Sequence, residues 1–106
     1  MKILNKSQIE GFLSQVVKKG KIIYGTNEVL EELKGSKAVI VSQSIKPNIR
    51  QKLYRDCKKN SIPIIEYDGS SIELGRAIGK NFRISVLSIK STGGYDLKEI
   101  LPEVKS

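Results

Sequence analysis

Residues 62–89 read IPIIEYDGSSIELGRAIGKNFRISVLSI, and this stretch indicates the fold class. An apolar run at 64–67 follows Pro63, and proline is accepted at the first position of a strand. A second apolar run, at 84–89, also has the length of a strand. Because the residues between the two runs carry helix signals, the stretch predicts a strand, a helix and a strand in succession.

The helix expected between these strands begins with a capping box. Ser70 and Glu73 stand three residues apart, so each side chain can bond the backbone N–H of the other residue. Gly79 suits the end of the helix because glycine adopts the left-handed conformation without strain. The run DGSS at 68–71 could also cradle a phosphate, but a turn and a cap explain it more simply. The residues of this helix expected to face the core are Ile72, Ala77 and Ile78.

The same alternation runs through the first half of the chain. A second capping box, Ser7 with Glu10, predicts a helix that ends at Gly20. Its expected inner face consists of Ile9, Phe12, Leu13, Val16 and Val17. Short apolar runs at 21–24 and 38–42 predict two more strands.

Further helices follow these two strands. One is expected from about Thr26 to Gly35, with Val29, Leu30 and Leu33 inward. Another has Pro47 in its first turn and Asn60 at its end. Its inner face is expected to consist of Ile49, Leu53 and Cys57. After the STGG turn, residues 95–101 could add a final helical stretch.

Four repeats of helix and strand predict an α/β fold, namely a three-layer α/β/α sandwich with a small four-stranded mixed sheet. A chain of 106 residues is expected to be one domain, residues 1–106. In such sheets, ligands meet the loops at the strand ends. The candidate site loops are therefore IIYGTNE at 22–28, SQSIKP at 42–47 and GKNFR at 79–83.

The charge balance points to a polyanionic partner. The chain contains 19 Lys and Arg residues and 11 Asp and Glu residues, which gives a net charge of +8. No acidic residue occurs between Glu32 and Asp56 or between Glu73 and Asp96. The basic residues in these windows are Lys34, Lys37, Lys46, Arg50, Lys52, Arg55, Arg76, Lys80, Arg83 and Lys90. We expect the two windows to form one basic face.

Several classes of function lack their sequence signals. Neither G-x-x-x-x-G-K-[ST] nor G-x-G-x-x-G occurs, so the common nucleotide-phosphate loops are not encoded. With no histidine and the single cysteine Cys57, the chain can build neither a histidine-assisted nucleophile nor the usual zinc sites. No apolar run approaches the roughly 20 residues of a membrane span. We therefore expect no catalytic residues, no metal, no cofactor, no membrane and a cytoplasmic location.

The stretch 62–94 also resembles a known family. Its marks are Ile62-Pro63, Glu66, Gly69 with Ser71, Glu73-Leu74-Gly75, Gly79 and Phe82-Arg83. Together with GKIIYG at 20–25 and AVIVS at 38–42, these motifs resemble the L-thirty-e family of large-subunit ribosomal proteins of archaea and eukaryotes. That family belongs to the kink-turn RNA-binding superfamily. A kink-turn is an RNA internal loop that bends sharply beside sheared G·A pairs and extrudes one nucleotide.

The resemblance implies a structural role in the large ribosomal subunit, with ribosomal RNA and neighbouring ribosomal proteins as partners and a monomer when free. It also implies three RNA-contacting segments. By position these comprise Gly25, Thr26, Asn27 and Glu28; Gln43, Ser44 and Lys46; and Asn81, Phe82 and Arg83. Residues 25–28 look more like the general kink-turn readers, such as the small box C/D guide-RNA proteins, and Glu31 stands where those readers tend to have lysine.

The residue types of these loops suit RNA independently of the family. Phe82 lies in a polar and basic loop, where its ring could stack on an unpaired base or close the end of the sheet. Lys46, Lys80 and Arg83 are expected to contact phosphates. Glu28 could read guanine donors or only complement the helix dipole. The alternatives to a ribosomal protein are a reader of box C/D-type guide RNA and a small nucleotide-binding enzyme.

Overall fold

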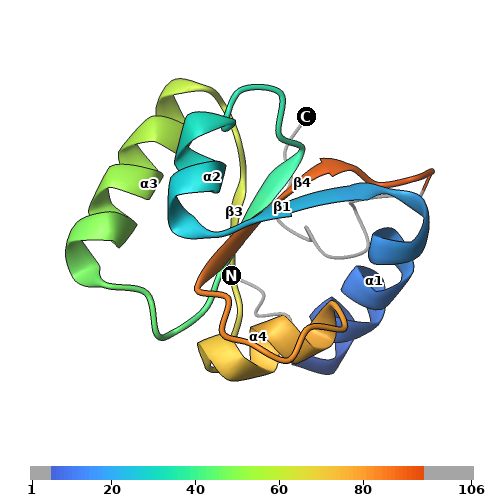
Figure 1. Ribbon diagram of the computed structural model, residues 1–106. Helices are drawn as coiled ribbons and strands as arrows, with labels where there is room; N and C mark the ends of the chain where they lie inside the picture. Colours follow the sequence, from blue (N-terminus) through green and yellow to red (C-terminus); the bar gives the residue numbers. More distant parts are fainter. Residues whose placement is uncertain (1–5, 95–106) are drawn as a thin grey trace.

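The computed structural model describes residues 6–94 of the chain, and four strands form one sheet within them (Figure 1). The strands are β1 (Lys21–Tyr24), β2 (Ala38–Val41), β3 (Ile64–Glu66) and β4 (Val86–Ser91). Their order is β1-β4-β2-β3, with β2 and β3 parallel and β4 antiparallel to both of its neighbours. The sheet is therefore mixed, as the sequence predicts.

Helices cover both faces of this sheet (Figure 1). They are α1 (Lys6–Lys19), α2 (Thr26–Glu31), α3 (Pro47–Lys59) and α4 (Ser71–Ala77). Helices α1 and α4 pack on one face and α2 and α3 on the other, which gives a separate apolar cluster on each side. The three-layer α/β/α architecture is confirmed. The helical stretch expected at 95–101 lies outside the described residues.

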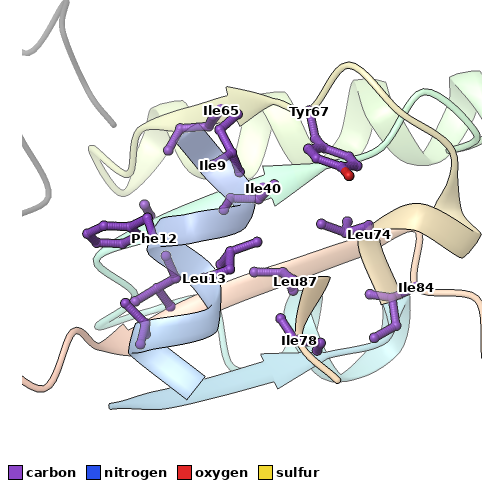
Figure 2. Close-up of a cluster of buried hydrophobic side chains, with 13 residues drawn as sticks. Ile9, Phe12, Leu13, Ile40, Ile65, Tyr67, Leu74, Ile78, Ile84 and Leu87 are labelled. Carbon is purple, nitrogen blue, oxygen red and sulfur yellow. The ribbon is translucent and has the colours of Figure 1, made fainter. Parts of the chain in front are cut away.

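Alternate residues of the central strands supply the two clusters. Ile40 and Leu87 face α1 and α4, whereas Val39, Val41 and Val86 face α2 and α3, because successive side chains of a strand point to opposite faces. Figure 2 shows Ile9 and Leu13 of α1 packed over the first of these faces, with Leu74 of α4 and Ile78, which directly follows α4, beside them. This packing holds the ends of all four strands in a fixed arrangement.

The capping box predicted at Ser7 and Glu10 is wrong. Helix α1 already includes Lys6, so Ser7 is a helical residue and not the cap. The Glu10 carboxylate accepts a hydrogen bond from the hydroxyl of Tyr67, with the oxygen atoms 2.5 Å apart. The Tyr67 side chain is fully buried, and this burial, with the Glu10 bond, raises the pKa of its phenol. Glu10 therefore joins α1 to the end of β3.

Two apolar residues assigned to the core face solvent instead. Val17 in α1 is 39% exposed and Ile72 in α4 is 37% exposed. The inner face of α4 consists of Ser71, Leu74 and Gly75, which recur at three- and four-residue spacing. Ile72 lies outside that stripe. The helix itself begins as predicted, because Ser70 and Glu73 form the complete capping box.

Helix α2 begins at Thr26 as predicted but ends at Glu31, four residues before the predicted end at Gly35, whereas the remaining bounds differ little from the prediction. Helix α3 begins with Pro47 and ends at Asn60, and Cys57 inside it is buried. Burial and the nearby Asp56 carboxylate raise the pKa of the Cys57 thiol to about 11. Strand β4 begins at Val86, two residues later than expected. No described helix has the length and apolar character needed to cross a membrane.

Candidate nucleic-acid interface

All four strands have an end at one edge of the sheet, and Glu66, the last residue of β3, pairs there with Val41. Tyr24 and Val41, the last residues of β1 and β2, pair with Leu87 and Val86 at the start of β4. We call this end of the sheet, where the strands run into the loops, the loop edge. The segments that leave the sheet there are 25–28, 43–46 and 80–83. All three segments predicted from the sequence to contact RNA are thus brought together.

Backbone hydrogen bonds hold two of these segments to the start of β4. The Gly25 N–H donates to the Val86 carbonyl at 3.2 Å, and the Ser42 N–H donates to the Ser85 carbonyl at 2.9 Å. Neither bond depends on a side chain, so the relative position of the segments is set by the sheet itself. The loop edge is a preformed surface.

Ser71, at the start of α4, links the second segment to the third. Its N–H donates to the Ser44 hydroxyl oxygen at 3.2 Å, and its carbonyl accepts from the Ile84 N–H at 3.0 Å. Nearby, a Cβ added at Gly75 would lie 2.1 Å from the Phe82 carbonyl oxygen, so only glycine lets the third segment pack there. Sequence reasoning did not assign these roles. The signal was a glycine inside a helix, where it costs about 1 kcal/mol relative to alanine.

The first segment places Glu28 over a glycine. Gly25 has φ of +102° and ends β1, and a Cβ added there would approach the Glu28 Oε1 atom to 2.5 Å. Glu28 lies in the first turn of α2 and is exposed, as is Asn27, whereas Thr26 is half-buried. Among the described residues, no donor bonds the Glu28 carboxylate. Its oxygens are therefore available to a ligand.

Phe82 forms an exposed aromatic pair with Tyr24. The two ring centroids lie 5.7 Å apart at an interplanar angle of 45°, and the Phe82 residue is 47% exposed. The Lys80 Nζ atom lies 5.5 Å from the centroid of the Tyr24 ring, within reach of a cation–π contact. Phe82 belongs to neither core cluster, whereas Tyr24 packs against the cluster beneath α1 and α4. Tyr24 was not predicted as a site residue, although it directly precedes Gly25.

The second segment is tied to the turn before α4. The Gln43 amide nitrogen donates to the Asp68 carboxylate at 2.7 Å, and the Gln43 N–H donates to the Gly69 carbonyl at 2.9 Å. The Ser44 hydroxyl oxygen already accepts from α4, but its proton is free to be donated. Lys46 is exposed directly before α3. The Gln43 and Ser44 side chains are thus held in place and still exposed to a ligand.

The single basic face predicted from the acid-free windows is wrong. Lys46, Lys80 and Arg83 lie at the loop edge, but Lys34 and Lys90 lie at the opposite edge, where the Lys90 ammonium donates to the Lys34 carbonyl at 2.8 Å. The reason is that each acid-free stretch of sequence contains a strand, β2 or β4, so its two ends lie at opposite edges of the sheet. Arg50 is also partly neutralised, because it bonds the Glu66 carboxylate at 2.5 Å.

Comparison with known proteins identifies the family. The model of the Ribosomal protein L7Ae/L30e/S12e/Gadd45 family matches residues 7–99. The chain belongs to this family. The membership agrees with the resemblance carried by residues 62–94.

Curated members of this family match the chain over most of its length. The large ribosomal subunit protein eL30 of Saccharolobus solfataricus is 35% identical over 96 residues, covering 89% of each chain. The protein of that name from Sulfolobus acidocaldarius is 37% identical over 98 residues, covering 91% of this chain and 94% of its own. These relatives carry the name of a ribosomal protein and not of an enzyme, in agreement with the prediction that the chain is not an enzyme.

A solved structure has the same fold. The structure of a protein of unknown function from Bacillus halodurans C superposes with a TM-score of 0.70 at 22% identity, covering 92% of this chain and 93% of its own. At this identity the similarity speaks for the fold alone. It agrees with the α/β/α sandwich described above.

Proposed function

We propose that this protein binds a kink-turn in ribosomal RNA with its loop edge, as a structural component of the large ribosomal subunit. The observation that carries the proposal is the half-exposed Phe82 ring, which pairs with Tyr24 at the same edge of the sheet where α2 presents Glu28. The names of the relatives support the choice of ribosomal RNA. On this proposal, neighbouring ribosomal proteins are further partners, and the free protein is a cytoplasmic monomer until it joins the ribosome.

Glu28 and Asn27 would read the sheared G·A pairs. A carboxylate near RNA is repelled by phosphates, so it favours binding only where it accepts hydrogen bonds from base donors such as guanine N1–H and N2–H₂. Asn27 can both donate and accept beside it. Gly25 and Thr26 would let the RNA approach the first N–H groups of α2, which no side chain caps.

Phe82 would stack on the extruded nucleotide. Unpaired bases in RNA are recognised by stacking on aromatic rings, and each such contact contributes about 1–3 kcal/mol. Tyr24 contacts the Phe82 ring at a tilt of 45°, and the exposed Asn81 directly precedes Phe82 in the chain. This pair gives the loop edge a hydrophobic surface that one base can cover.

The basic residues of the loop edge would contact phosphates. Lys46, Lys80 and Arg83 carry flexible or planar cations that position RNA without selecting its sequence. Gln43 and Ser44 add neutral donors between them. These contacts predict strong salt dependence, whereas the contacts of Glu28 and Phe82 predict discrimination between RNAs.

The test is binding of the purified protein to a kink-turn RNA and to the same RNA with its G·A pairs replaced by Watson–Crick pairs. We expect clear preference for the kink-turn, and equal affinity for both RNAs would refute the proposal. Sedimentation after a salt wash tests the ribosomal part, because the protein should travel with large subunits. Crosslinking to total RNA followed by sequencing would instead show guide RNA if the alternative, favoured by the match of residues 25–28 to the guide-RNA readers, is correct.

A further inference from the structure

The edge of the sheet opposite the loop edge is rich in lysine. Six exposed lysines lie there, at the end of α1, the start of β1, the α2–β2 connection and the end of α3. They are Lys18, Lys21, Lys34, Lys37, Lys58 and Lys59. We call this the lysine edge. It contains none of the residues assigned to the kink-turn.

Backbone contacts place these elements side by side. Lys21 pairs with Ser91 at the end of β4, and the Lys37 N–H donates to the Ile89 carbonyl at 2.6 Å. The Lys90 ammonium bonds the carbonyls of Glu32 and Lys34, which holds the end of α2 against the same strand. Figure 1 shows β4 running from the side of α4 towards the side where α1 joins β1. The ends of α1 and α3, which carry Lys18, Lys58 and Lys59, lie at the same end of the sheet because they lead into the starts of β1 and β3.

The charges of this edge are not neutralised within residues 6–94. The two ion pairs of the described residues, Lys6 with Glu73 and Arg50 with Glu66, involve none of the six lysines. The nearby carboxylates are Glu31, Glu32 and Asp56, so cations outnumber them. A surface of this kind attracts an anionic partner.

The chemistry of the edge selects one class of partner. Lysine is a point charge that contacts phosphate without the planar fork with which arginine recognises base edges. No aromatic ring is exposed among the described residues of this edge, so unpaired bases have nothing on which to stack. We propose that the lysine edge binds the phosphate backbone of a second, double-helical RNA segment.

The two edges are at opposite ends of the strands, so one molecule can engage both RNAs at once. The four residues of β2 separate the two edges by roughly 13 Å, so the two RNA segments would approach from opposite ends of the strands. Binding at the lysine edge is sequence-independent and depends on salt. The protein would thus join a kink-turn to a neighbouring RNA helix. This role goes beyond kink-turn binding, and its test is separate.

The test uses a fluorescent Watson–Crick RNA duplex without a kink-turn, added to the full chain already saturated with unlabelled kink-turn RNA. We expect the complex to bind the duplex. The variant Lys37→Gln with Lys58→Gln should weaken duplex binding and lower the slope of log affinity against log salt by about 0.9 per lost contact. The control, Lys52→Gln with Arg55→Gln on the outer face of α3, removes the same charge elsewhere and should leave that slope nearly unchanged.

The outcomes separate this inference from the kink-turn proposal. Equal effects of the two double variants, or loss of duplex binding on saturation with kink-turn RNA, would overturn the inference. So would binding to phosphatidylserine vesicles that the duplex does not compete away. Unchanged kink-turn affinity in the Lys37 and Lys58 variant shows that it is folded. A protein that shows no preference for the kink-turn would refute the proposed function alone. The lysine edge would still be tested, because the duplex can be titrated with the protein in the absence of kink-turn RNA.

Discussion

Replacing Glu28 by alanine distinguishes an RNA-reading carboxylate from one that only stabilises a helix. Glu28 is exposed in the first turn of α2, and none of the described residues bonds its carboxylate. Its removal should therefore cost the fold only the helix-dipole contribution, about 0.3–1 kcal/mol. A change in RNA affinity larger than this must come from a lost contact with the RNA.

Two opposing terms set the expected change in affinity. Loss of a negative charge relieves repulsion from a phosphate, worth about 1 kcal/mol at 4 Å in water and less in salt. Loss of hydrogen bonds from guanine to a carboxylate costs about 1.5–3 kcal/mol. The difference is a net loss of roughly 0.5–2 kcal/mol, or about 2- to 30-fold in affinity for the kink-turn.

The assay is a titration of kink-turn RNA and of its Watson–Crick-paired counterpart with each variant. Glu28→Gln keeps the shape but offers one acceptor instead of two, so it should also lose affinity. Glu31→Ala is the matched control, because it removes the same charge from the exposed end of the same helix. Its affinity for each RNA should equal or slightly exceed that of the unmutated protein.

The sign of the effect decides the matter. If Glu28 reads guanine, Glu28→Ala loses most of the discrimination between the two RNAs, whereas Glu31→Ala keeps it. Equal or tighter binding of the kink-turn by Glu28→Ala would refute the reasoning and leave Glu28 as a helix-end charge.

Three further predictions concern single side chains. Phe82→Ala should cost about 1–3 kcal/mol of kink-turn affinity. Because the ring is half-exposed, its removal should cost roughly 1 kcal/mol of folding stability, which lowers the melting temperature by about 4–8 °C. A larger fall in melting temperature with unaltered binding would assign the ring to the core. Lys46→Ala should weaken binding to matched and mismatched RNAs alike and lower the salt slope by about one unit or less, whereas a changed RNA preference would contradict a phosphate contact. Cys57, buried with a pKa raised to about 11, should resist a thiol reagent at pH 8 until the protein is unfolded in denaturant, and fast labelling of the native protein would contradict this burial.

Local signals predicted the elements well. Ser70 with Glu73 and Pro47 each mark a helix start through geometry that involves only a few neighbouring residues, and the structure confirms both. The capping box at Ser7 and Glu10 failed because a longer-range partner, Tyr67, takes the Glu10 carboxylate. The residue types near Glu10 do not reveal that Tyr67, 57 residues later in the chain, binds its carboxylate.

Which residues of a helix face the core depended on tertiary packing. Val17 and Ile72 have apolar side chains at positions that seemed periodic, yet both are exposed. In α4 the sheet-facing stripe includes Ser71 and Gly75, which are small or polar, because the chain after Phe82 packs directly against it. Hydrophobicity alone does not reveal such a close backbone approach.

By itself, the sequence determined the order of helices and strands, the three-layer class and the three loops that could meet a ligand, because each depends on short-range periodicity and on turn residues. Only the tertiary structure decided that Tyr24 pairs with Phe82 and that Ser71 joins two loops. It also divided the basic residues. A strand advances about 3.3 Å per residue, so the four residues of β2 separate Lys37 from the loop that holds Lys46 by roughly 13 Å and direct them to opposite edges of the sheet.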